Sequence, residues 1–153
     1  MEISINPERP DTADAMQLID ELEADLALLY PSEHRYGYNV EKLLQQGVHF
    51  FVLHFGGELA GCGGVQFYGQ EYAELKRMYV RPQFRGQGLG KALVDFLAEY
   101  TRDNEITLLR LETGTHQHAA IHLYERIGFQ RVPPFGDYVA SPDNIFYEMR
   151  LTP

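Results

Sequence analysis

A glycine-rich segment between two regular patterns constrains this chain more than any other feature. Residues 83–91 hold three glycines at alternate positions: Gly86, Gly88 and Gly90. The segment follows a predicted strand, residues 73–80, and opens a predicted helix, residues 89–100. Glycines let the backbone approach a ligand closely, and the free N–H groups and dipole of a first helical turn attract anions. With Arg85 and Lys91 at the same end, the segment predicts an anion-binding strand–loop–helix unit.

Two familiar nucleotide motifs do not match this segment. A Walker A loop requires serine or threonine after its lysine, but Ala92 follows Lys91. A Rossmann loop requires G-x-G-x-x-G, but the third glycine, Gly90, comes one residue early. The unit also lies in mid-chain after a predicted hairpin, whereas a Rossmann unit opens a βαβ run. Both nucleotide motifs are therefore disfavoured.

The rest of the chain alternates strand and helix patterns without a linker. Alternating or apolar runs predict strands at residues 3–5, 49–55, 58–68, 108–111, 129–132 and 145–151. Helical periodicity predicts a helix that begins after Asp11 or Thr12 and ends before Pro31, a short one from Asn39 to Leu44, and one at residues 120–127. A length of 153 residues suits one domain, spanning 1–153. The element order predicts an α/β domain around a mixed sheet.

The composition argues against several classes of protein. A formal net charge of −9 disfavours a nucleic-acid binder, and the apolar runs are far too short to span a membrane. The N-terminal residues lack signal-peptide features, which favours a cytoplasmic protein. The single cysteine, Cys62, excludes an internal disulfide and a zinc cage of cysteines, and we expect it to be packed rather than nucleophilic.

Charge is unevenly distributed along the chain. Residues 75–94 contain five basic residues and no acidic residue, which suggests one small anionic partner. The predicted first helix and its start carry a run of acids: Asp11, Asp14, Asp20, Glu21, Glu23 and Asp25. This run is either a solvated helix face or an acidic wall that attracts a cationic substrate.

Two separated motifs resemble those of one enzyme superfamily. Residues 83–88, Gln-Phe-Arg-Gly-Gln-Gly, follow the pattern R/Q-x-x-G-x-G/A and resemble the acetyl-coenzyme A signature of the GNAT N-acetyltransferases. Residues 74–80 look like the fourth strand of that superfamily, and residues 120–129 look like its later helix and strand, A-x-x-L-Y-x-x-x-G-F. The match covers residues 73–132. It implies a GNAT-like α/β (α+β) domain with a mixed, mostly antiparallel sheet of about six to seven strands flanked by about four helices.

The resemblance implies acetyl-coenzyme A as cosubstrate and no metal. In the superfamily the fourth strand carries a bulge and splays from the fifth, so that its exposed peptide groups pair with pantetheine. This places Met78, Tyr79 and Val80 along the cofactor arm, with the Met78 N–H as donor to the thioester carbonyl. The pyrophosphate is then expected on the backbone N–H groups of Arg85, Gly86, Gln87, Gly88, Leu89, Gly90 and Lys91.

Three further residues receive roles from the resemblance. Tyr124 matches a tyrosine that often protonates the departing thiolate, although it also lies on a helical stripe of core residues. Gln117 stands where many relatives have an asparagine that bonds pantetheine, and its amide reaches from one methylene farther. Glu74 matches a strand position that serves as base in some relatives. Alternatively, Glu74 is a carboxylate paired with a nearby lysine or arginine, and an amine deprotonated in solution attacks directly.

The resemblance places the acceptor groove between the first two helices and the last hairpin. Candidate lining residues there are Tyr30, His34, Arg35, Tyr36, Tyr38, Phe135, Tyr138 and Tyr147. Aromatic walls suit a small amine or an amino-acid-like acceptor, and Arg35 can hold a carboxylate. Alternatively, these aromatics pack the loops against the core. The implied function is transfer of an acetyl group to a primary amine by direct attack in a ternary complex.

Other functions stay open at this point. The domain could instead bind acetyl-CoA as a sensor or partner module, or acetylate proteins or peptides. His118 and His122 have the i, i+4 spacing of a helical zinc site, but no H-E-x-x-H is present, and we interpret them with His116 as polar residues near a loop. The expected partners are a small-molecule amine, no nucleic acid and no membrane, with the protein a monomer or homodimer.

Overall fold

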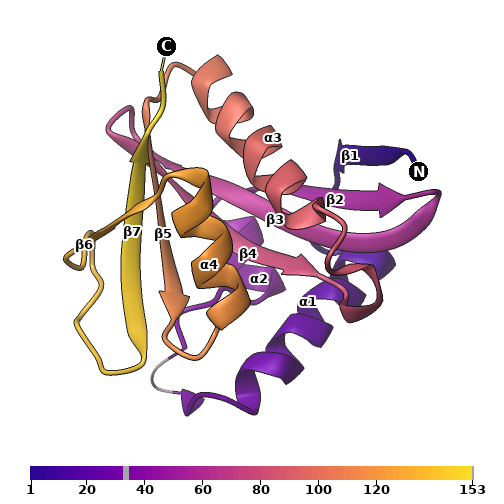
Figure 1. Ribbon diagram of the computed structural model, residues 1–153, viewed down its shortest axis with the longest axis horizontal. Helices are drawn as coiled ribbons and strands as arrows, with labels where there is room; N and C mark the ends of the chain where they lie inside the picture. Colours follow the sequence, from indigo (N-terminus) through magenta and orange to yellow (C-terminus); the bar gives the residue numbers. More distant parts are fainter. Residues whose placement is uncertain (33–34, 153) are drawn as a thin grey trace.

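The computed structural model describes residues 1–32 and 35–152. The elements follow in this order (Figure 1): β1 (Ile3–Pro7), α1 (Ala13–Ala27), α2 (Val40–Gln45), β2 (His49–Phe55), β3 (Glu58–Tyr68), β4 (Tyr72–Val80), the 3₁₀ turn η2 (Pro82–Phe84), α3 (Leu89–Asp103), β5 (Leu108–Gly114), α4 (His118–Ile127), β6 (Gln130–Val132) and β7 (Asn144–Arg150). This is the order predicted from the sequence. None of the helices in the described ranges is long and apolar enough to cross a membrane.

The strands form one seven-stranded sheet in the order β1-β2-β3-β4-β5-β7-β6. The pair β4–β5 is parallel, and the other described pairs are antiparallel. The mixed, mostly antiparallel sheet flanked by four helices, implied by the resemblance, is therefore confirmed.

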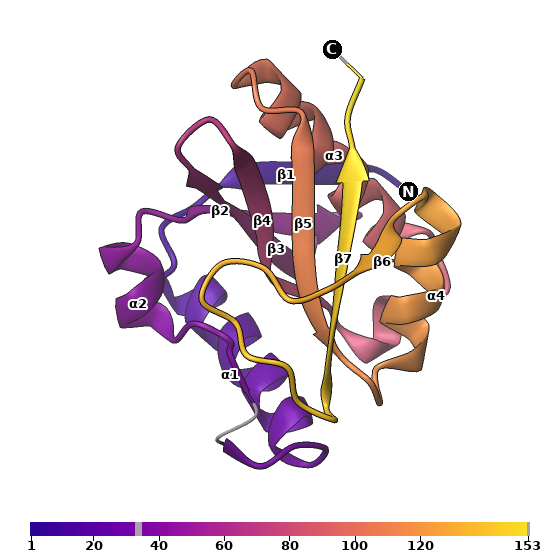
Figure 2. The same ribbon diagram turned by 90° about the vertical axis from the view of Figure 1, so that its left-hand side faces the viewer.

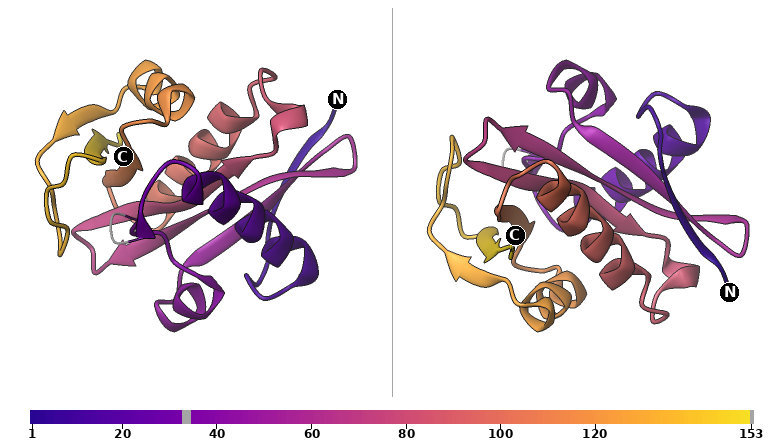
Figure 3. Two further views of the ribbon diagram at one scale, coloured as in Figure 1. Left: turned by 90° about the horizontal axis from the view of Figure 1, so that it is seen from below. Right: turned by 90° about the horizontal axis from the view of Figure 1, so that it is seen from above.

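Alternation along β2 shows how the sheet is covered. Phe50 and Val52 pack with α1 and α2, whereas Phe51 and Leu53 pack with α3 and α4. Successive strand residues point to opposite faces, so the two pairs of helices cover opposite faces of the sheet, as Figure 3 shows. The fold is thus a three-layer domain with a core on each side of the sheet.

Side chains cap the two helices that cover one face of the sheet, α1 and α2. Thr12 is the N-cap of α1, and its hydroxyl accepts a hydrogen bond from Ala15 N at 3.2 Å. Asn39 caps α2 in the same way, from Lys42 N at 2.8 Å. The α1–α2 connection passes close to the β6–β7 connection (Figure 2), where the ring of Tyr36 meets that of Tyr138 edge-on at 5.1 Å.

Candidate active site

A bulge in β4 turns its centre toward a cavity. The register of β3 and β4 shifts between Cys62 and Gly64, so that Arg77 and Met78 both face the single residue Gly63. Arg77 has a φ of +56°, in the left-handed region that residues with a side chain rarely adopt. A Cβ on Gly63 would lie 2.5 Å from Met78 Sδ, so glycine lets the Met78 side chain pack directly opposite the bulge. The bulge expected from the resemblance is confirmed.

β4 and β5 separate after Glu74, before the chain reaches the bulge. They are paired at Ala73–Leu109 and Glu74–Arg110 and then diverge (Figure 1), as the resemblance implied. A cavity of about 100 Å³ is lined by residues of both strands, of α1 and of the α1–α2 connection, together with Gln117, Tyr124 of α4 and Asn144. The gap between the parallel strands β4 and β5 is therefore lined by residues from helices on both faces of the sheet, α1 and α4.

The glycine segment forms an exposed turn before α3. Gly86 and Gly88 have φ of +79° and +78°, and Gly88 is the N-cap of α3. The Arg85 N–H donates a 3.2 Å bond within the preceding 3₁₀ turn, so free N–H groups begin at Gly86 rather than at Arg85. Gly90 has a different role, since a Cβ there would lie 2.9 Å from Leu123 Cδ2 of the neighbouring helix. The turn and the first turn of α3 suit a phosphate group.

Each of the five basic residues in 75–94 forms an ion pair. The pairs are Lys76–Glu74 (3.0 Å), Arg77–Glu23, Arg81–Glu21 (2.8 Å), Arg85–Asp25 (3.7 Å) and Lys91–Asp95 (2.6 Å). Three of these acids, Glu21, Glu23 and Asp25, belong to the acidic run of α1, so this half of the run neutralises basic residues on and after β4. The side chains of Arg85 and Lys91 are 53% and 63% exposed, which leaves these two cations accessible beside the glycine turn.

Tyr124 and Gln117 lie at the cavity on either side of the α4 N-terminus. Tyr124 is buried, its ring packs edge-on against Phe129, and burial raises the pKa of its hydroxyl, with a smaller contribution from Glu112. The hydroxyl therefore stays protonated at neutral pH. The amide oxygen of Gln117 accepts a 2.9 Å bond from Gly114 N, so its NH₂ group is the end left for a ligand.

Glu112 is a cavity residue that the sequence did not suggest. It lies on β5, and its carboxylate accepts a 2.5 Å hydrogen bond from Asn144 Nδ2 of β7. Burial raises the pKa of Glu112 to about 7, and Glu74 adds to this rise, whereas Asn144 and the cations Lys76 and Arg77 act in the opposite direction. A carboxyl group with that pKa can take a proton from an ammonium near neutral pH.

Glu74, the residue predicted as base, lies outside the cavity lining. Its carboxylate is 2% exposed, pairs with Lys76 Nζ at 3.0 Å and accepts a 2.5 Å hydrogen bond from the Tyr138 hydroxyl. The ammonium of Lys76 also lies 4.1 Å from the ring centre of Tyr38. These contacts match the alternative in which Glu74 is a carboxylate paired with a nearby lysine.

Three of the predicted acceptor residues line the cavity: Tyr30, Arg35 and Tyr36. The hydroxyl of Tyr30 accepts a 2.9 Å bond from His116 N, and its ring packs so closely on Gly114 that a Cβ there would lie 2.0 Å from the hydroxyl oxygen. Arg35 Nη1 bonds Glu23 at 3.3 Å. His34, also predicted, lies outside the described residues.

The other predicted aromatics pack elsewhere. Phe135 and Tyr138 join an aromatic cluster with Tyr72 and Phe146, as the packing alternative expected. Tyr147 is buried in the core, and its hydroxyl donates a 2.7 Å bond to Glu125 of α4. Tyr38 stacks under Lys42 and Lys76 instead of facing the cavity.

Cys62 and the histidines of the described ranges form no further site. Cys62 is fully buried, which raises the pKa of its thiol to about 12, and the thiol donates a 3.4 Å bond to the Arg77 carbonyl. The prediction of a packed cysteine is confirmed. Within residues 1–32 and 35–152, no group of three or more His, Cys, Asp or Glu side chains is arranged to hold a metal ion.

Comparison with known proteins identifies the family. Residues 15–129 match the profile described as the Acetyltransferase (GNAT) family. An IAA acetyltransferase from Azospirillum brasilense is 34% identical over 150 residues, which are 97% of this chain and 98% of that protein. The chain therefore belongs to the GNAT acetyltransferase family, and the prediction of an N-acetyltransferase is confirmed.

Solved structures agree with this assignment. A proposed acyl-CoA N-acyltransferase from Klebsiella pneumoniae is 35% identical, with a TM-score of 0.83 over 98% of both chains. A GNAT family acetyltransferase from Elizabethkingia anophelis, solved with acetyl-CoA bound, has a TM-score of 0.73 at 21% identity, over 97% of this chain and 98% of that one. At the lower identity the likeness supports the fold alone.

Proposed function

We propose that the protein transfers the acetyl group of acetyl-CoA to the primary amine of a small molecule, by direct attack while both are bound. The observation that carries this proposal is a convergence in one cavity. Met78 at the bulge of β4, Glu112 of β5 and Tyr124 of α4 all line it, and the glycine turn follows the end of β4.

The chain supplies three groups for the transfer. When bound, acetyl-CoA supplies an acetyl group activated as a thioester. Glu112 takes a proton from the ammonium and leaves the amine with the lone pair that it needs for attack. The Met78 N–H donates a hydrogen bond to the carbonyl oxygen where negative charge grows. The Tyr124 hydroxyl, kept protonated by burial, gives its proton to the departing sulfur. The nitrogen that attacked then loses its remaining extra proton, which restores the phenol of Tyr124 directly or through solvent.

Cofactor binding is assigned to the turn after β4. The free N–H groups from Gly86 to Lys91 and the dipole of α3 suit a diphosphate, with Arg85 and Lys91 exposed beside them. Tyr79, Val80 and the Gln117 amide remain proposed contacts of the pantetheine arm. The cytoplasmic location and the monomeric or homodimeric state stay predictions, which cell fractionation and light scattering would test.

Thiol release measured with acetyl-CoA and a panel of amines tests the proposed function. We expect release only when an amine is present, with the acetylated amine as product.

Tyr124→Phe should bind acetyl-CoA normally in calorimetry but turn over at least about 100-fold more slowly. Arg85→Glu should weaken acetyl-CoA binding. Binding of acetyl-CoA without transfer to any amine would instead indicate a sensor module, and transfer only to protein N-termini or lysines would replace the small acceptor.

A further inference from the structure

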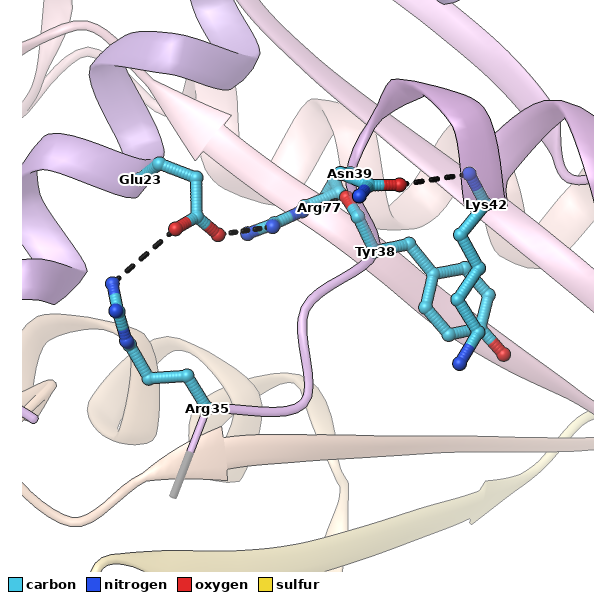
Figure 4. Close-up of polar contacts among 6 residues, drawn as sticks. All are labelled: Glu23, Arg35, Tyr38, Asn39, Lys42 and Arg77. Carbon is cyan, nitrogen blue, oxygen red and sulfur yellow. Dashed lines mark hydrogen bonds and ion pairs between the residues drawn. The ribbon is translucent and has the colours of Figure 1, made fainter. Parts of the chain in front are cut away.

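At the wall of the cavity, one carboxylate, that of Glu23, forms ion pairs with two arginines. Glu23 of α1 lies between the guanidinium groups of Arg35 and Arg77 (Figure 4), bonding Arg35 Nη1 at 3.3 Å and Arg77 Nη2 at shorter range. Both arginines line the cavity. This group of three residues therefore carries one positive charge in excess.

The two arginines differ in how firmly they are held. The Arg77 guanidinium is 2% exposed, donates a 2.6 Å bond to the Tyr38 carbonyl, and lies so close to Gly37 that a Cβ there would be 2.4 Å from it. Its position is fixed by packing. Arg35 is 22% exposed, and its Nε is buried without a hydrogen-bond partner among the described residues. A buried N–H donor without a hydrogen-bond partner costs free energy, so Arg35 is the arginine that can gain by binding an anionic ligand.

A negative group lies in the same cavity. Glu112 comes from β5, whereas Arg35 comes from the α1–α2 connection, so the two opposite charges approach the cavity from different elements. A ligand with an ammonium and a carboxylate is complementary to this arrangement. A simple amine leaves the charge of Arg35 without a ligand partner.

The size of the cavity limits the enclosed part of such a ligand. A dry protein cavity of about 150 Å³ holds benzene. This cavity has about 100 Å³, so it encloses fewer atoms than a benzene ring, and a longer chain must extend outside it.

We infer that the acceptor is a small amino acid whose carboxylate binds Arg35 while its amine faces Glu112. The inference rests on the proposed function and adds the class of acceptor to it. Arg77 is a positioning residue, since it holds Glu23 and the Tyr38 carbonyl and thereby the loop that carries Arg35.

Matched pairs of acceptors test the inference. Glycine, L-alanine, β-alanine and 4-aminobutyrate are each compared with the corresponding amide, using thiol release for kcat/KM and calorimetry for acceptor binding to the protein saturated with coenzyme A. A neighbouring carboxylate favours the charged form of an ammonium, so each amide has more free amine at a given pH. Higher kcat/KM and tighter binding for at least one amino acid than for its amide therefore cannot come from amine basicity.

Variants test whether the preference for an amino acid over its amide depends on Arg35. Arg35→Gln should raise KM for the amino acid about 10- to 100-fold, the value of a charge-assisted hydrogen bond, and leave KM for the amide almost unchanged. Arg35→Lys should recover part of the loss. Arg9→Gln, which removes an exposed arginine paired with Asp11 outside this cavity, is the matched control and should change neither KM.

The outcomes separate this inference from the proposed function. Turnover with amides equal to that with amino acids, or an Arg35→Gln effect equal on both, would overturn the carboxylate contact and leave the acetyltransferase intact. Transfer to peptide N-termini but to no free amino acid would also overturn it. Acetyl-CoA binding without turnover for any amine would remove the proposed function. In that case, calorimetry of amino-acid binding to the wild type and to Arg35→Gln would still test the contact between Arg35 and the carboxylate.

Discussion

Two carboxylates on neighbouring strands of this protein have opposite surroundings. Glu74 of β4 is buried against the ammonium of Lys76 and the hydroxyl of Tyr138. Glu112 of β5 lines the cavity and is held by the neutral amide of Asn144, and no ion pair involves it within residues 1–32 and 35–152. Burial raises the pKa of Glu112 to about 7. A carboxylate is thus suited to proton transfer where the fold gives it no fixed countercharge.

The largest effect is expected at the carboxylate without a countercharge. Glu112→Gln keeps the size and the bond to Asn144 but cannot take a proton, so kcat/KM should fall about 100- to 1000-fold. Acetyl-CoA binding, measured by calorimetry, should stay unchanged because the glycine turn is untouched. A loss below about threefold would remove Glu112 from the base role and favour attack by an amine deprotonated in solution.

At Glu74 the main effect should be on folding. Glu74→Gln leaves the buried ammonium of Lys76 without its partner charge, which typically costs about 3–5 kcal/mol. Urea unfolding should show this loss, while kcat per folded molecule falls far less than in Glu112→Gln. The reverse result, a stable but inactive Glu74→Gln protein, would return the base role to Glu74.

Glu112→Gln, which should lower activity, should also raise the stability of the folded protein at high pH. The pKa of Glu112 is about 7 in the folded protein and near 4.5 when unfolded, so folding favours its protonated form. Stability from this group is therefore full below about pH 4.5 and falls as the pH rises toward 7. Glu112→Gln should remove this loss, so that at pH 8 its free energy of unfolding, measured with urea, exceeds that of the wild type by about 3 kcal/mol. Equal stability at pH 8 would contradict the raised pKa.

Local sequence predicted the glycine turn, the proposed cofactor half of the site, better than the proposed acceptor half. The glycine turn and the start of α3 belong to one stretch, residues 83–91, so turn chemistry and helix periodicity were enough to find them. The acceptor half joins α1, the α1–α2 connection, β4, β5 and β7. Sequence patterns do not report which of these meet.

Glu112 and Glu74 show why local sequence could not identify the acceptor half. The predicted strand ended at Leu111, so Glu112 fell outside it, whereas β5 continues to Gly114. An acidic residue at a polar position of that strand was the available signal, but only the separation of β4 from β5 exposes it to a cavity. The resemblance points to Glu74 as the base. Its partner Tyr138 lies 64 residues away in the sequence, so local sequence does not reveal that Glu74 is buried in a fixed pair.

The smallest effect links the two carboxylates through space. In the wild type, kcat/KM should rise with pH and level off above about 7, as Glu112 loses its proton. The charge of Glu74 raises the pKa of Glu112 and that of Lys76 lowers it. Glu74→Gln should therefore move this limb to lower pH and Lys76→Gln should move it to higher pH, each by up to about one unit. Shifts in the same direction would mean that both variants act by distorting the cavity, whereas opposite shifts require the charges themselves.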